Sequence, residues 1–172
     1  LIPHYNNPQG LLRSLASIDA AECCDVLVVD GKGDETCALM GAIMMNAAKK
    51  LGLAGVVLDA ACRDSLELEE LGFPVFSVGT NPNGPTKQVG GRIGHPISCG
   101  GVTVCAGDYI CADADGVVVV ERDKIESLLP LAAHKVTAEA KRIAQIQQGD
   151  TAAPWLTASL VTAGVLKAGE TL

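Results

Sequence analysis

The stretch Asp25-Val-Leu-Val-Val-Asp-Gly31 decides the fold, and a second stretch with the same pattern, Gly55-Val-Val-Leu-Asp59, follows it in the chain. Each is a short run of branched aliphatic residues that ends in an aspartate, which is typical of a strand buried on both faces. Between the two runs, apolar residues recur at helical spacing from Ile43 to Leu51, and Gly52 is a stop signal. A strand, a helix and a second strand in this order predict a βαβ unit with two parallel strands.

The remaining sequence extends this α/β pattern. We predict a glycine-rich loop over residues 31–36, a short acidic helix over 65–71 and a further strand over 73–78. A long connection rich in Gly, Pro and Asn follows over 79–101. We then expect short strands over residues 96–99, 102–104, 109–111 and 117–120. The last expected element is an amphipathic helix over residues 122–149, with a candidate break at Pro130.

The length of 172 residues suits a single domain with a sizeable core. Within it we expect a loop or tail over residues 1–18, a core over 19–121 and a C-terminal helical segment over 122–172. The sequence begins at Leu1, without a methionine, in a stretch that reads as a tail. We therefore expect that an N-terminal portion of the protein is missing from this sequence.

Composition excludes several classes of protein. The net charge is −7 and the pI is about 4.8, and no run of Lys or Arg forms the basic footprint of a nucleic-acid binder. The apolar runs are far shorter than the roughly 20 residues that span a bilayer, so we expect no membrane segment. The 7 cysteines are odd in number and form no CxxC pair, which favours reduced thiols in a cytoplasmic protein over a disulfide framework or a structural zinc site.

Arg63 and Asp64 are the strongest candidates for chemistry, because they follow the second strand of the βαβ unit. Ligands of α/β sheets gather at the carboxyl ends of parallel strands, beside helix N-termini that offer backbone N–H groups to anions. Arg63 could bind a carboxylate through two parallel hydrogen bonds, and Asp64 could hold a hard divalent ion together with waters. The alternative interpretation is a helix cap with a solvated charge. A second acidic motif, Asp113-Ala-Asp-Gly116, predicts a tight turn rather than a calcium loop.

Five segments together resemble one known family in order and spacing. They are Asp25–Gly31, Gly41–Lys49, Gly55–Asp64, Glu70–Phe76 and Gly100–Val120. The chain is similar over residues 20–145 to the family that contains regulator of ribonuclease activity A and the class II 4-hydroxy-4-methyl-2-oxoglutarate/4-carboxy-4-hydroxy-2-oxoadipate aldolases. The resemblance implies a layered, swivelling β/β/α fold of the phosphohistidine-domain type. It also implies a homotrimer or hexamer with its active sites between subunits.

The resemblance to the aldolases further implies a substrate, a cofactor and a mechanism. The substrate would be a small 2-oxo acid, cleaved to pyruvate by retro-aldol chemistry, and decarboxylation of oxaloacetate through the same enolate would be a second activity. By resemblance, Arg63 would clamp the substrate and Asp64 would hold Mg²⁺ or Mn²⁺. The start of the first helix would line the substrate with Gly41, Ala42, Ile43 and Met44.

One position departs from the aldolase pattern. The aldolases have an acid 21 residues before the arginine, and this chain has Ala42 there. Nearby charged residues, namely Lys32, Asp34 and Glu35, are candidate substitutes. The acid that some family members contribute across the subunit interface falls near Glu139, for which a solvated helix position is an equal alternative. Ala42 therefore keeps two other functions open: a non-catalytic binding or regulatory protein of the ribonuclease-regulator type, and a related lyase or decarboxylase that needs no acid at this position.

Overall fold

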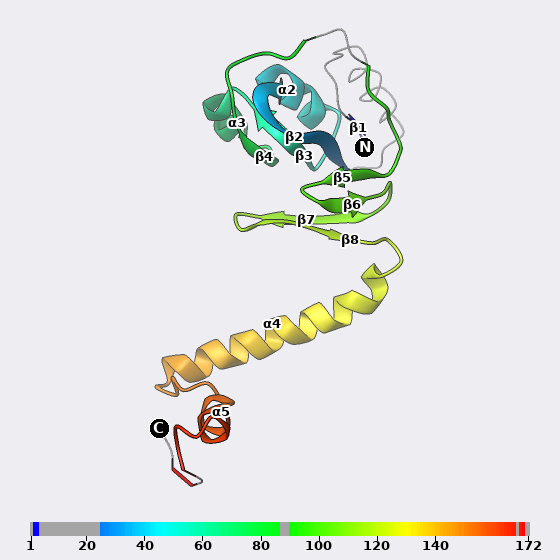
Figure 1. Cartoon of the computed structure of the whole chain (residues 1–172). Helices are drawn as coiled ribbons and strands as arrows, with labels where there is room; N and C mark the ends of the chain where they lie inside the picture. Colours follow the sequence, from blue (N-terminus) through cyan, green and yellow to red (C-terminus); the bar gives the residue numbers. More distant parts are fainter. Residues whose placement is uncertain (1, 4–24, 87–89, 168, 171–172) are drawn as a thin grey trace. The chain divides into compact units, whose positions relative to one another are not determined.

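The computed structural model describes residues 2–3, 25–86, 90–167 and 169–170 of the chain (Figure 1). It divides into two compact units, Leu1–Ile125 and Glu126–Leu172, and each unit is described by itself. No helix in these described ranges is long and apolar enough to cross a membrane.

A parallel sheet with the strand order β1-β2-β3-β4 forms the centre of the first unit. Its strands are β1 (Ile2–Pro3), β2 (Val26–Met40), β3 (Gly55–Cys62) and β4 (Val75–Thr80). Helix α2 (Ala42–Lys50) connects β2 to β3, and helix α3 (Ser65–Leu71) connects β3 to β4. The structure thus confirms the predicted βαβ unit and the short acidic helix after it.

Strand β2 differs from the prediction. We expected it to end at Gly31 and to be followed by a loop, but its pairing with β3 continues to Met40 through three register shifts. Positive φ angles at Lys32 (60°) and Gly33 (67°) turn the chain within this irregular stretch. Gly31 lets the two strands stay close, because a Cβ there would lie only 2.4 Å from the Cβ of Ala60. The pairing is restored where Met40 lies opposite Cys62, so both strands end further along than the local sequence indicates.

The helices pack against one face of the sheet. Side chains alternate between the faces of a strand, so Leu27 and Val29 point to one side and Val28 to the other. The helix side holds the larger buried cluster, to which α2 contributes Met45 and α3 contributes Leu68. The strand members of this cluster are Leu27, Val29, Met40, Val56, Leu58 and Cys62.

Two antiparallel hairpins cover the opposite face of the sheet. They are formed by β5 (Ile97–Cys99) with β6 (Val102–Val104), and by β7 (Tyr109–Asp113) with β8 (Gly116–Val120). Val28 and Val57 of the sheet share a second buried cluster with Ile97 and Val104 of the first hairpin. Figure 1 shows the resulting order of helices, parallel sheet and hairpins. The predicted β/β/α layering is confirmed.

The predicted turn at residues 113–116 joins β7 to β8. Asp113 pairs with Gly116 across the hairpin, and the N–H of Asp115 donates to Oδ1 of Asp113 at 2.9 Å. The carboxylate therefore stabilises the turn, as we expected for this motif.

The second unit is helical. Helix α4 (Ile125–Gln147) runs through Pro130 without a break, and α5 (Leu156–Thr162) follows it. Pro130 is the sixth residue of α4, so the helix continues although one backbone N–H donor, facing the carbonyl of Glu126, is missing. Arg142 joins the end of α4 to the next segment, because its Nη1 pairs with Asp150 at 3.1 Å and its Nη2 donates to the carbonyl oxygen of Ala152 at 2.6 Å.

Met45 and Ile43 provide a test of how α2 docks on the sheet. The side chain of Met45 is 0% exposed and that of Ile43 is 86% exposed. Met45→Ala should lower the free energy of unfolding by about 2–5 kcal/mol, because it leaves a cavity between α2 and the sheet. Ile43→Ala, the matched control, should change it by less than about 0.5 kcal/mol. Urea unfolding followed by circular dichroism measures both values, and equal losses would contradict this packing.

Candidate active site

The candidate site lies where β2 and β3 end and the two crossover helices begin. The chain leaves β2 at Met40 and enters α2 through Gly41, and it leaves β3 at Cys62 and enters α3 through Arg63 and Asp64. The backbone N–H of Arg63 donates to the carbonyl oxygen of Met40 at 3.1 Å, and this hydrogen bond holds the end of β2 beside the end of β3. Helices α2 and α3 therefore begin close together, at the carboxyl edge of the parallel sheet.

Asp64 does not act as an ordinary helix cap. It occupies the N-cap position of α3, but its side chain makes no capping hydrogen bond to that helix. Its Oδ2 atom instead accepts a hydrogen bond of 2.8 Å from the backbone N–H of Ala42, at the start of α2. Its backbone is left-handed, with φ 63° and ψ 43°, a conformation that costs on the order of 1 kcal/mol for a residue other than glycine. The helix-cap interpretation therefore does not account for this carboxylate.

Gly41 allows this approach because it has no side chain. A Cβ at this position would lie 2.4 Å from Oδ2 of Asp64 and 2.8 Å from Cγ of Arg63. The φ of Gly41 is −149°, an extended backbone that any residue adopts. Space, and not backbone conformation, therefore requires glycine at this position.

Arg63 presents a guanidinium with open donors. Its side chain is 36% exposed, and its Nε lies 3.8 Å from Oδ2 of Asp64, which is 37% exposed. An ion pair this exposed contributes only about 0–1 kcal/mol to stability. Within the described ranges, neither terminal nitrogen of Arg63 makes a hydrogen bond. The guanidinium is thus able to bind a carboxylate through two parallel hydrogen bonds.

The other residues predicted to line a substrate lie on the first turn of α2. Ala42 is half-buried and Ile43 is exposed, while Met44 packs at the edge of the larger core cluster. Among the described residues, no acceptor is found for the backbone N–H of Ile43, which lies in the first turn, where helix donors are free to bind an anion. The structure therefore brings Gly41, Ala42, Arg63 and Asp64 together.

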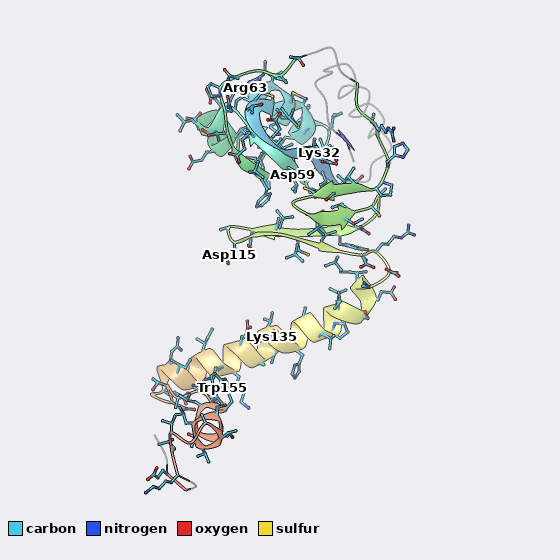
Figure 2. All side chains as sticks on the ribbon, in the orientation of Figure 1. Lys32, Asp59, Arg63, Asp115, Lys135 and Trp155 are labelled. Carbon is cyan, nitrogen blue, oxygen red and sulfur yellow. The ribbon has the colours of Figure 1, made fainter. Side chains whose placement is uncertain are left out.

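Asp30 and Asp59 do not belong to this place. β3 continues past Asp59 to Cys62, and Figure 2 shows Asp59 and Lys32 toward the hairpin β5-β6, away from Arg63. Asp30 is 4% exposed, accepts the backbone N–H of Lys32 at 3.1 Å and forms an ion pair with the ammonium of the same residue. Our expectation that both acids stand at strand ends was wrong, because the paired strands extend beyond them.

Cysteine chemistry finds no support in the described residues. Burial, together with the charges of Asp59 and Asp30, raises the pKa of the Cys99 thiol to about 11, so this thiol stays protonated and weakly nucleophilic at neutral pH. Cys62 is buried, and its sulfur lies 3.3 Å from Oγ of Ser77. The cysteines of the described ranges that remain unpaired are Cys37, Cys62, Cys99, Cys105 and Cys111.

The residues that could replace the missing acid at position 42, namely Lys32, Asp34 and Glu35, contact other groups. The ammonium of Lys32 pairs with Asp30, and the carboxylate of Asp34 accepts two hydrogen bonds from Thr36. The carboxylate of Glu35 lies beside β4, where a Cβ on Gly79 would be 3.1 Å from its Oε2.

Glu139 belongs to the second unit, on α4. Its carboxylate lies 3.4 Å from Nζ of Lys135, in an exposed pair one helical turn apart. Its role at the site stays a prediction.

A metal at this place would depend on one carboxylate. No group of three His, Cys, Asp or Glu side chains that could hold a metal occurs in the described part of the chain. Mg²⁺ keeps several waters and often binds proteins through one or two carboxylates. Asp64 fits that mode, because Oδ2 is anchored by the N–H of Ala42 while the partly exposed carboxylate faces solvent.

Sequence reasoning missed the segment Asn81–Gly84. It follows β4, and a Cβ on Gly84 would lie 3.6 Å from Nη1 of Arg63. The run Asn81-Pro-Asn-Gly-Pro85 directly after a parallel strand was the available signal, because such a turn must lie near the carboxyl ends of the neighbouring strands.

Comparisons with known proteins agree on one family. The family model described as RraA-like, Aldolase/RraA, matches residues 6–119. A protein of Halalkalibacterium halodurans named "Putative 4-hydroxy-4-methyl-2-oxoglutarate aldolase" is 43% identical over 124 residues, which cover 72% of this chain and 59% of that protein. The chain thus spans less than two thirds of the length of this relative.

Two solved structures share the fold at moderate identity. RraA of Thermus thermophilis, described as an RNA-processing inhibitor, is 31% identical with a TM-score of 0.58, and the match covers 69% of this chain and 70% of that one. A Geobacillus kaustophilus structure titled as an S-adenosylmethionine:2-dimethylmenaquinone methyltransferase is 35% identical with a TM-score of 0.62, covering 73% of this chain and 76% of that one. The layered α/β fold is therefore the fold of RraA proteins.

Gly41→Ala tests the close approach that builds the site. The new methyl group would collide with Asp64 and Arg63, so we expect the hydrogen bond from Ala42 to break and the Ala42 amide to exchange with solvent at least about tenfold faster. Gly90→Ala is the control, because a Cβ there meets no described atom within 4 Å. Hydrogen exchange measured by NMR distinguishes the two variants. An unchanged Ala42 amide in Gly41→Ala would refute the steric argument.

Proposed function

Because the chain belongs to the RraA-like family, Aldolase/RraA, we propose that it is a divalent-metal-dependent lyase that cleaves a 4-hydroxy-2-oxo acid to pyruvate. The observation that carries this proposal is that Arg63 and Asp64, at the start of α3, lie beside the start of α2. Among the described residues the terminal nitrogens of Arg63 have no hydrogen-bond partner, and Asp64 is held by the N–H of Ala42 instead of capping its own helix. The name of the bacterial relative supports the reaction class.

Arg63 would bind the carboxylate of the 2-oxo acid. Its guanidinium lies beside the first turn of α2, where the partial positive charge of a helix N-terminus also favours an anion. The chain carries a net charge of −7, so an anionic substrate needs a locally positive place such as this one.

Asp64 would hold Mg²⁺ or Mn²⁺, with waters as the remaining ligands. A divalent ion bound there would polarise the oxo group of the substrate. Asp64 would also stay oriented during turnover, because its Oδ2 is fixed by the backbone of α2.

The reaction requires a proton acceptor and a stabiliser of negative charge. When the 4-hydroxyl loses its proton, C4 becomes a carbonyl carbon and the C3–C4 bond breaks. The electron pair passes to the enolate of pyruvate, and C3 then takes up a proton. Arg63 would stabilise the enolate charge through preorganised N–H donors. Loss of carbon dioxide from oxaloacetate gives the same enolate, so decarboxylation is the second activity that we propose.

Ala42 cannot accept the hydroxyl proton, so another group must do so. We assign this role to a bound water or to an acid from a neighbouring subunit in a homotrimer or hexamer, for which Glu139 is the candidate. Glu139 lies on an exposed helix that has no buried residue in the described part of the chain.

A regulatory function is the second candidate, and a specific observation favours it. Ala42 removes the acid that the aldolases carry, while the fold of the RNA-processing inhibitor from Thermus thermophilis is retained. In that case the protein would bind a macromolecular partner and would not turn over oxo acids.

Pyruvate release from 4-hydroxy-4-methyl-2-oxoglutarate and from oxaloacetate tests the proposal. We expect pyruvate release with Mg²⁺ or Mn²⁺, and we expect a chelator to abolish it. The coupled oxidation of NADH measures the pyruvate. Asp64→Ala should lower the metal-dependent rate at least about 100-fold, and Arg63→Ala should raise KM at least about tenfold, with the fold retained. A folded protein that releases no pyruvate from either substrate would favour the regulatory function.

Ala42→Asp tests the effect of the lost acid. An aspartate at the first turn of α2 is compatible with the helix dipole, and it would place a second carboxylate beside Asp64. We expect aldolase kcat to rise at least about tenfold, because a positioned base contributes to proton transfer. Ala42→Asn, which cannot take a proton, is the matched control. Equal rates in the two variants would show that the acid at this position does not limit turnover.

A further inference from the structure

The segment Asn81–Gly84 is tied across the ends of both strands that build the site. The backbone N–H of Asn81 donates to the carbonyl oxygen of Cys62 at 2.9 Å, directly before Arg63. The backbone N–H of Ala38, on the last part of β2, donates to the carbonyl oxygen of Asn83 at 2.9 Å. The segment therefore continues the pairing of β4 with β3 and then crosses to β2.

The side chain of Asn81 uses both halves of its amide to hold this segment. Its Nδ2 donates to the carbonyl oxygen of Glu35 on β2 at 2.8 Å, and its Oδ1 accepts the backbone N–H of Asn83 at 2.8 Å. The first bond fixes the segment to β2, and the second closes the turn. Asn83 takes part only through its backbone, since its side chain makes no hydrogen bond in the described ranges.

Gly84 lies at the far end of the segment, against the guanidinium of Arg63. A Cβ on Gly84 would lie 3.6 Å from Nη1, in ordinary van der Waals contact, and apart from its chain neighbours it would meet no other described atom within 4 Å. The backbone of Gly84 is not left-handed, so neither conformation nor crowding demands glycine. Because Gly84 has no side chain, it leaves Nη1 of Arg63 uncovered on this side.

We propose that Asn81 is a positioning residue for Arg63, and that Gly84 keeps Nη1 open to the carboxylate of a 2-oxo acid. This inference rests on the proposed function, because it assigns the wall of the same site. A carboxylate that binds a guanidinium in the bidentate manner needs two adjacent N–H donors in one plane. Asp64 already lies next to Nε, so the terminal nitrogens, which make no hydrogen bond to the described residues, are the remaining donors, and Gly84 lies beside Nη1.

The first experiment compares Gly84→Ala with Gly90→Ala, using oxalate as the probe in titration calorimetry on the full chain with Mg²⁺. The methyl group on residue 84 would cover Nη1, and loss of one charge-assisted hydrogen bond should raise Kd at least about tenfold. The methyl group on residue 90 meets no described atom within 4 Å and should leave Kd unchanged. Equal Kd values in the two variants and the native protein would overturn the role of Gly84.

The second experiment compares Asn81→Asp with Asn83→Asp. Both variants add one negative charge to the same segment, so Asn83→Asp is the control for the added charge. Asn81→Asp keeps the acceptor for Asn83 but replaces the donor to Glu35 by an oxygen, whereas Asn83→Asp removes no hydrogen bond of the described structure. We expect Kd for oxalate to rise at least about tenfold in Asn81→Asp relative to Asn83→Asp, with thermal unfolding midpoints that stay within a few degrees.

The outcomes separate this inference from the proposed function. If the native protein binds oxalate and the two aspartate variants bind it equally, Asn81 does not position Arg63, and the proposed function stands. If Asn81→Asp lowers the unfolding midpoint but leaves Kd unchanged, its role is structural only and the inference fails. If the native protein does not bind oxalate, the proposed function fails, and the ligand assigned to Nη1 fails with it.

Discussion

The hydrogen bond between the N–H of Ala42 and Oδ2 of Asp64 joins the starts of the two crossover helices, and the geometry of the site depends on it. It forms because Gly41 leaves room for both Arg63 and Asp64, where any side chain would collide with them. The backbone hydrogen bond from Arg63 to Met40 also holds the ends of β2 and β3 together at this junction. The carboxylate of Asp64 is thereby held at one edge of the sheet, with the guanidinium of Arg63 beside it.

Asp64 lacks the interaction that would stabilise the start of its own helix. A helix is stabilised when the side chain at its N-cap accepts an N–H of its own first turn, which contributes about 1 kcal/mol. Asp64 makes no such bond and adopts a left-handed backbone. Its carboxylate instead accepts the N–H of Ala42, which begins a helix 22 residues earlier in the chain. Local strain that the surrounding structure maintains is common at functional sites.

The three layers explain why the polar residues of the sheet fall into two groups. Core residues occupy both faces of β2 and β3, so a polar side chain within these strands must find a partner between the layers. Asp30 does so with Lys32, beneath the hairpin β5-β6. Arg63 lies beyond the last paired residue of β3, its side chain is partly exposed, and within the described ranges its terminal nitrogens make no hydrogen bond.

The sequence by itself determined the elements and the adjacency of the candidate residues. Runs such as Asp25–Gly31 predict buried strands, helical spacing predicts α2, and Arg63 and Asp64 must follow β3 because they are its chain neighbours. Their resemblance to a family pattern added roles, and Ala42 could be recognised as a departure from it. These conclusions rest on local periodicity and order, which a single sequence carries.

Only the tertiary structure decided where the strands end and what surrounds Arg63. β2 continues past Gly31 because β3 offers partners up to Cys62, and local sequence does not encode that register. The partner of Asp64 is a backbone group on another helix, and the segment Asn81–Gly84 reaches Arg63 through hydrogen bonds to β2 and β3. Each of these contacts joins residues far apart in the chain, so each exists only after the sheet has brought the strand ends together.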